Sequence, residues 1–106
     1  EIISNRRRRL VIRTLDRRDP PVDIGVLAET VASVEEDIPR EEIRGEERKT
    51  AYISLYQYHL PALEADDILV LDEAGTMVVA HGPEFDAVYG AVEDLEARAG
   101  GGRDGK

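Results

Sequence analysis

The sequence of 106 residues contains no cysteine, which excludes disulfide bonds, thiol redox chemistry and metal sites built on thiolates. It also lacks long apolar runs. A run such as Ile68-Leu69-Val70-Leu71 is far below the roughly 20 residues that a membrane-spanning helix needs. No signal peptide is visible either. We therefore expect a cytoplasmic protein with no membrane contact, folded as one domain whose core needs neither disulfides nor metal.

Lysine is nearly absent, because Lys49 and Lys106 are the only lysines among 14 basic residues, which face 23 acidic ones. The formal net charge at pH 7 is −9. Acid-rich, lysine-poor surfaces suit a cytoplasm of multimolar salt, since carboxylates retain water and hydrated cations while the salt screens their mutual repulsion. We interpret the composition as that of a halophile's protein; an ordinary acidic protein is the alternative.

The basic charge gathers at the N-terminal end. Residues 1–18 contain seven arginines and two acidic residues, whereas residues 19–60 carry a net charge of −6 and residues 61–106 one of −8. Four of these arginines are consecutive: Arg6, Arg7, Arg8 and Arg9. Clustered arginines bind the phosphates of nucleic acids with release of counterions. The same cluster also suits a solvated helix face whose charges pair with the later acidic segments, and the sequence leaves both interpretations open.

Turn signals divide the chain into four helices and a β-hairpin. Asp19-Pro20-Pro21 and Asp37-Ile38-Pro39 separate the first three helices, because proline cannot donate a backbone hydrogen bond and restricts the residue before it. Ser4 and Asp23 are the expected N-caps of the first and second helices, and Val22-Asp23 can add a third strand to the hairpin. We predict helices at 5–17, 24–36, 45–60 (continuing past Pro61 to 65) and 84–99, and strands at 68–71 and 77–80.

This order of elements predicts a mainly helical α+β fold of the winged helix-turn-helix type. In that plan three helices are followed by a β-hairpin wing, and the third helix lies in the major groove of DNA. The winged helix-turn-helix domain is expected over residues 1–82, with an additional C-terminal amphipathic helix at 83–99 and a disordered tail at 100–106. Another α+β topology is the alternative.

Projected at about 100° per residue, the third helix has an apolar stripe and a polar flank. The stripe, which we expect to be buried, consists of Ile53, Tyr56, Leu60 and Leu63, with Tyr52 and His59 beside it. We interpret His59 as a hydrogen-bonded packing residue. The polar side chains can bond to base edges and phosphates, glutamine with adenine in particular. The residues expected to contact DNA are Arg48, Lys49, Ser54, Gln57 and Tyr58, with Arg6 to Arg9 on the backbone.

The segment from Ser54 to Leu69, SLYQYHLPALEADDIL, resembles the passage from recognition helix into wing of archaeal and bacterial winged-helix regulators. Together with Ser4-Asn5 and its four following arginines, and with Glu47-Arg48-Lys49, it is similar to a family of small haloarchaeal winged-helix proteins. The likeness covers about residues 3–80, and most members have no assigned function. The resemblance implies a DNA-binding transcriptional regulator of a halophilic archaeon.

Two acidic positions depart from the pattern of DNA readers. Glu47 belongs to the presumed reading face, and Asp72-Glu73 occupy the turn of the wing, where a wing that touches the DNA backbone carries arginine or lysine. These positions favour the alternative function, a winged-helix module that binds another protein and makes no direct contact with DNA.

The last helix repeats apolar residues at intervals of three and four. This spacing is typical of a seam that pairs with the same helix of a second subunit, and many helix-turn-helix proteins bind DNA as dimers. We therefore expect a homodimer; the alternative is that the helix packs on its own domain. The predicted dimerisation residues are Phe85, Val88, Tyr89, Val92 and Leu95.

No catalytic motif is recognisable. None of the three serines, Ser4, Ser33 and Ser54, lies in a Gly-x-Ser-x-Gly motif, and no glycine-rich phosphate loop precedes a helix. His81 has no second histidine nearby. We expect no enzyme activity, no cofactor and no metal site, and double-stranded DNA as the partner.

Overall fold

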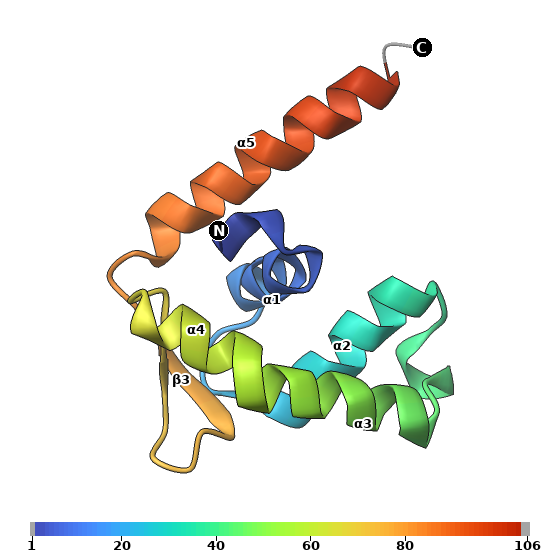
Figure 1. Ribbon diagram of the computed structural model, residues 1–106, viewed down its shortest axis with the longest axis vertical. Helices are drawn as coiled ribbons and strands as arrows, with labels where there is room; N and C mark the ends of the chain where they lie inside the picture. Colours follow the sequence, from blue (N-terminus) through green and yellow to red (C-terminus); the bar gives the residue numbers. More distant parts are fainter. Residues whose placement is uncertain (1, 105–106) are drawn as a thin grey trace.

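The helix boundaries follow the predicted turn signals in the computed structural model, which describes residues 2–104 (Figure 1). Most of the chain is helical, and three short strands form one sheet. The chain also contains two short 3₁₀ turns and one π-helical segment. In chain order the elements are η1 (Ile2–Ser4), α1 (Arg6–Arg17), β1 (Val22–Asp23), α2 (Ile24–Glu36), η2 (Arg40–Glu42), α3 (Gly45–Ser54), η3 (Leu55–His59, the π-helical segment), α4 (Leu60–Ala65), β2 (Leu69–Leu71), β3 (Met77–His81) and α5 (Phe85–Asp104).

Short polar side chains cap the first two helices. The N-cap of α1 is Asn5, whose side-chain oxygen accepts a hydrogen bond from the backbone N–H of Arg8 at 3.0 Å. The predicted cap, Ser4, instead ends the 3₁₀ turn that precedes it. Asp23 caps α2 as expected, because its carboxylate accepts from the backbone N–H of Gly25 at 2.6 Å. Together these caps place the start of each helix within a residue of its sequence signal.

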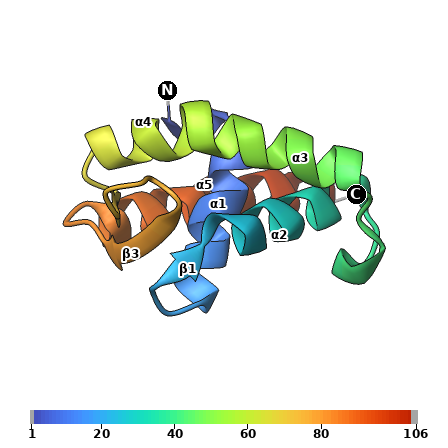
Figure 2. The same ribbon diagram turned by 90° about the horizontal axis from the view of Figure 1, so that it is seen from below.

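The sheet is antiparallel and has the strand order β1-β3-β2. Val22 pairs with Val78, so the short extended piece before α2 does supply the third strand, as predicted. The strands β2 and β3 form the predicted hairpin, with a bulge between Val70 and Leu71. The mainly helical α+β class is therefore confirmed. Figure 2 shows the sheet at one end of the helical layer.

The third helix is continuous from Gly45 to Ala65, but its middle turn, η3, is π-helical. The backbone N–H of Leu60 bonds to the carbonyl of Leu55, five residues earlier, rather than four. The extra residue places Leu55 and Leu60 on one face, which an α-helical projection separates. The buried face consists of Ala51, Leu55, Leu60 and Leu63.

Two residues of the predicted stripe are consequently not buried. Ile53 is 41 % exposed and Tyr56 is 43 % exposed, so the expectation of a buried Ile53 and Tyr56 was wrong, whereas it is confirmed for Leu60 and Leu63. The cause is the π turn, which shifts the helical register between the two halves of the stripe. A regular period of 3.6 residues cannot describe a helix that contains such a turn.

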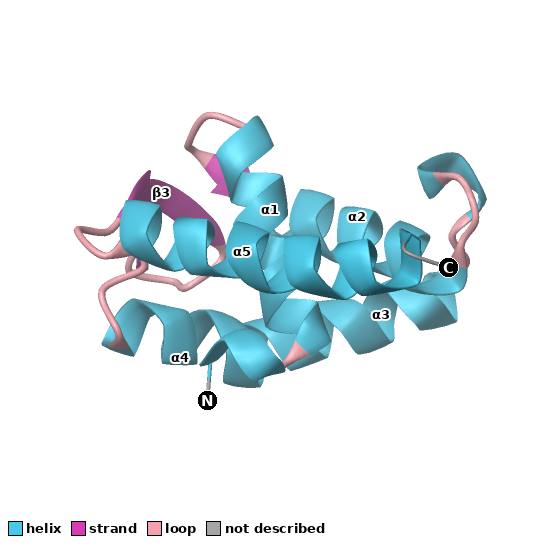
Figure 3. Cartoon of the chain, turned by 90° about the horizontal axis from the view of Figure 1, so that it is seen from above, coloured by secondary structure: helices cyan, strands magenta, loops and turns pink. Residues whose placement is uncertain are grey.

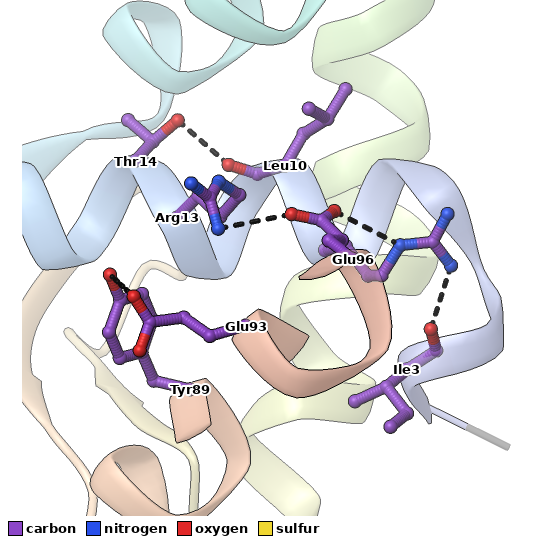
Figure 4. A network of polar contacts seen from close by, with 8 residues as sticks. Ile3, Leu10, Arg13, Thr14, Tyr89, Glu93 and Glu96 are labelled. Carbon is purple, nitrogen blue, oxygen red and sulfur yellow. Dashed lines mark hydrogen bonds and ion pairs between the residues drawn. The ribbon is translucent and has the colours of Figure 1, made fainter. Parts of the chain in front are cut away.

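The last helix packs on the body of its own chain. Phe85 and Val92 are buried in the common core with residues of α1 and α2. The carboxylate of Glu96 forms ion pairs with two arginines of α1 (Figure 4). Its oxygens lie 3.4 Å from Nε of Arg9 and 3.0 Å from a guanidinium nitrogen of Arg13. Figure 3 shows α5 passing across α1, and Figure 1 shows α2 on the opposite side of α1 from α5.

The helix α5 extends to Asp104, whereas the sequence predicts its end near Ala99. Glycine weakens a helix by about 1 kcal/mol per residue but does not block its hydrogen bonds as proline does, so three glycines need not stop it. Residues 105 and 106 of the predicted tail lie outside the described residues. Within residues 2–104, no helix is both long and apolar enough to cross a membrane.

Candidate nucleic-acid interface

The outward side of the third helix carries the polar residues that the sequence singles out. Lys49 and Gln57 are exposed, Tyr58 is 64 % exposed, and Ser54 is half-buried. These side chains come from α3 and η3, on the helix whose other side carries the buried Ala51 and Leu55. The core therefore fixes the helix by one face and leaves a polar face accessible to a partner.

Arg8 joins α1 to this helix. Its Nε donates a hydrogen bond to Nδ1 of His59 at 2.9 Å, so one of the four N-terminal arginines lies beside the predicted reading helix. Burial lowers the pKa of His59 below its ordinary value, and the charges of Arg8 and Arg7 lower it further against an opposing effect of Glu35. His59 is therefore held as the neutral acceptor of this hydrogen bond, in agreement with its interpretation as a packing residue.

The other arginines of the N-terminal cluster do not lie together as one strip. Arg7 forms a two-pronged ion pair with Glu35 of α2, and its pKa is raised chiefly by that hydrogen bond. Arg9 donates to the carbonyl of Ile3 at 2.8 Å and contacts Glu96. Arg6 is exposed and has no acidic partner among the described residues. The structure thus divides the cluster into two arginines engaged in ion pairs and two, Arg6 and Arg8, that are not.

The two predicted cations of α3 differ in the same way. The Nε of Arg48 lies 3.1 Å from a carboxylate oxygen of Glu29, which also holds Arg40 at 3.1 Å. Lys49 is exposed and has no acidic partner among residues 3–99, whose side chains the structure describes. Of the two, Lys49 is the cation available to a phosphate without loss of an existing ion pair.

At the two acidic positions that depart from the pattern of DNA readers, Glu47 and Asp72 have structural roles. A carboxylate oxygen of Glu47 accepts from the backbone N–H of Arg44 at 2.9 Å, which closes the first turn of α3. The carboxylate of Asp72 accepts from the backbone N–H groups of Thr76 at 2.9 Å and Met77 at 3.2 Å, which closes the hairpin turn. Both positions are explained by local capping chemistry, whereas Glu73 is simply exposed.

Two exposed residues of this face, Ile53 and Tyr56, belong to the stripe that the sequence predicts to be buried. Tyr56 lies beside the turn of the hairpin, since a Cβ at Gly75 would be 3.5 Å from its ring, and it stacks with Tyr52 at 6.4 Å between ring centroids. The helix and the hairpin turn therefore meet at Tyr56. The sequence contains one signal of the π turn: the two leucines Leu55 and Leu60 are five residues apart. Residues with this spacing share a face in a π turn but not in an α-helix.

The predicted dimerisation residues are split by the fold. Phe85 and Val92 are buried in the chain's own core, and Val88 and Tyr89 are half-buried against it, whereas Leu95 is 37 % exposed. Among these five residues, only Leu95 is exposed to a second subunit. The hydroxyl of Tyr89 donates to Glu93 at 3.0 Å (Figure 4), and this bond raises the pKa of Tyr89 above its usual range.

Comparison with known proteins places the chain in a family. Residues 1–79 match the model of a family described as a domain of unknown function, DUF7344. No curated protein matches the chain, and no solved structure does. The matched residues include the first three helices, β1, β2 and most of β3, and they end before α5. The chain therefore belongs to the DUF7344 family.

Proposed function

We propose that the protein is a DNA-binding transcriptional regulator of a halophilic archaeon, with a winged helix-turn-helix domain that reads double-stranded DNA as a homodimer. The topology supports this assignment: three helices precede a hairpin, and β1 joins the hairpin in the order β1-β3-β2. The observation that carries the proposal is the accessible polar face of the third helix, with Lys49, Gln57 and Tyr58 opposite the buried Ala51 and Leu55.

The residues of this face have distinct roles in the proposed complex. Gln57 can form a bidentate pair with adenine in the major groove, and Tyr58 and Ser54 can add hydrogen bonds to bases or phosphates. Lys49 supplies a phosphate contact, with Arg8 at the neighbouring end of α1. The side chains that fix the helix are apolar and buried, so its polar face is held rigidly for recognition.

The overall negative charge does not by itself oppose DNA binding. A local surface can have a potential of the opposite sign to the net charge, and here Lys49 and Arg6 have no acidic partner among the described residues. Counterion release contributes less to affinity when the surrounding salt is concentrated. In a saline cytoplasm, affinity would therefore depend chiefly on shape, hydrogen bonds and apolar contacts, which an acidic protein can provide.

Selection of bound duplexes from a random DNA pool at high KCl, followed by gel-shift measurement, tests the proposal. Gln57→Ala should change which sequences are preferred, because it removes a base contact. Lys49→Ala should weaken binding to all sequences alike and reduce the salt slope of log K by about 1, because it removes one phosphate contact. Both positions are exposed, so unfolding curves of the two variants should match that of the wild type.

The second candidate function is a module that binds another protein. Three of the predicted DNA contacts, Arg7, Arg9 and Arg48, are engaged in intramolecular ion pairs, and this favours a protein partner over a phosphate backbone. If wild-type protein retains no duplex from the pool at any KCl concentration, this function replaces the regulator.

A further inference from the structure

Ile53 is an apolar side chain in the middle of the polar face of the third helix. It is 41 % exposed, and it lies on the side of α3 opposite Ala51, which is buried at the contact with α2. Single exposed apolar residues are common on protein surfaces and need no explanation by themselves. Ile53 differs from the others in its position, because it stands between residues suited to contact DNA.

Lys49, Ile53 and Gln57 follow one another at intervals of four residues and are all exposed. In an α-helix, residues four apart lie on one side and about 6 Å apart along the axis, and this applies to Lys49 and Ile53 of α3. Gln57 lies in the π turn of η3, about one turn beyond Ile53, and is exposed like it. Base pairs stack about 3.4 Å apart, so Ile53 and Gln57 would address bases one or two steps from each other. Lys49 lies one further turn toward the start of α3.

The chemistry of the major groove gives an apolar side chain a specific ligand there. Of the four bases, only thymine presents a methyl group, at C5, and apolar side chains contact it. We propose that Ile53 recognises the C5 methyl group of a thymine one or two base pairs from an adenine bound by Gln57. This inference rests on the proposed function and adds its specificity: a site containing an A·T-rich step in the major groove.

An apolar contact between Ile53 and a thymine methyl group contributes affinity even where salt is concentrated. Contacts to phosphates lose affinity as salt rises, whereas burial of a methyl group does not depend on counterions. Concentrated salts that are excluded from protein surfaces even strengthen the burial of apolar groups. The third helix presents Lys49 as a cation without an acidic partner among the described side chains of residues 3–99, so an apolar contact beside it would supply affinity that salt leaves intact.

Replacement of single thymines by uracil in the selected duplex tests the proposal, because uracil lacks only the C5 methyl group and leaves the minor groove unchanged. Fluorescence anisotropy at fixed KCl should show one or two positions where uracil weakens binding by about fourfold, the value of one buried methyl group. In Ile53→Ala, the thymine duplex should bind as weakly as the uracil duplex, and the discrimination should disappear.

Two variants serve as controls. Val34→Ala shortens a residue that is 46 % exposed on α2, outside the third helix, and should retain the fourfold preference for thymine. Gln57→Ala should relax the preference for adenine while the uracil effect persists. All three variants alter exposed side chains, and their unfolding curves should coincide with that of the wild type.

The outcomes distinguish a failure of thymine recognition by Ile53 from a failure of DNA binding itself. If the wild type binds selected duplexes but no uracil position matters, or if Ile53→Ala still prefers thymine, the inference about Ile53 is wrong while the regulator stands. If the wild type binds no duplex, the proposed function fails and the inference fails with it.

Discussion

His59 shows how one residue of the candidate interface depends on its neighbours. Its Nδ1 accepts from Nε of Arg8 at 2.9 Å, and this bond requires an unprotonated nitrogen. Burial and the adjacent arginine charges keep the pKa of His59 below 6.5, its ordinary value. In the unfolded chain the imidazole accepts a proton more readily than in the folded protein. The contact between α1 and η3 therefore depends on pH.

We predict that the folded state loses stability as the pH falls below about 6.5, because between the two pKa values the unfolded state binds more protons. Above 6.5 the contribution of His59 is complete; it is lost as the pH falls toward the lower pKa of the folded state. Urea unfolding from pH 7.5 to 5.5 measures the slope. His59→Gln retains an acceptor for Arg8 but does not titrate, and it should show a smaller loss over this range. An unchanged slope in the variant would contradict the role of His59.

At the scale of elements, most boundaries could be predicted because they depend on local chemistry. Pro20-Pro21, the Asp23 cap and the turn at Asp72 act within a few residues, and the structure places helices and strands accordingly. The buried face of the third helix depends instead on a π turn, which puts Leu55 and Leu60 into the common core with residues of α2 and the sheet. Periodicity therefore misassigned Ile53 and Tyr56, and with them the apolar part of the candidate interface.

Because Leu55 is buried and Ile53 is exposed, truncating these two side chains should affect stability differently. Leu55→Ala should lower the free energy of unfolding by about 2 to 5 kcal/mol, since it creates a cavity in the core. Ile53→Ala, two residues away, should change it by less than about 0.5 kcal/mol, as is usual for surface sites. Urea unfolding of both variants decides the matter. If Ile53→Ala lowers the free energy of unfolding as much as Leu55→Ala does, or more, then Ile53 is buried as the regular helical projection predicts.

The connection between β3 and α5 depends on Gly82. Its backbone N–H bonds to the carbonyl of Ile68 at 2.9 Å, and a Cβ at this position would overlap the backbone of Asp67 and Ile68. Gly82→Ala should therefore destabilise the fold by about 2 kcal/mol or more, because the backbone must move. Gly90→Ala, at an open position within α5, should stabilise it by up to about 1 kcal/mol. Thermal unfolding of the pair measures both; a Gly82→Ala variant as stable as the wild type would show that this approach is not tight.

At the scale of the whole molecule, the fold redistributes the charge asymmetry of the sequence. The basic N-terminal segment is folded against acidic residues of α2 and α5, through Arg7 with Glu35 and through Arg9 and Arg13 with Glu96. The sequence left open whether the arginine cluster is a phosphate-binding strip or a solvated, paired face. Residues distant in the chain determine the answer, which is mixed: two of the four consecutive arginines are in ion pairs.

The position of α5 separates its contribution to folding from its proposed role in dimerisation. Val92 is buried within the chain, whereas Leu95, three residues later, is 37 % exposed. We predict that Val92→Ala lowers the free energy of unfolding by about 2 kcal/mol at every protein concentration, because it removes buried methyl groups and leaves a cavity. Leu95→Asp should leave the stability of the monomer within about 0.5 kcal/mol of the wild type.

Sedimentation equilibrium of the same two variants tests the dimer. If α5 joins two subunits through its outward side, Leu95→Asp should sediment as a monomer at concentrations where the wild type and Val92→Ala are dimeric, since it buries a charge in the contact. The dependence of stability on concentration should disappear in Leu95→Asp for the same reason. A wild type that is monomeric throughout would assign α5 to the core alone, where two of the five predicted dimerisation residues, Phe85 and Val92, are already buried. Each DNA half-site would then be read by a separate chain.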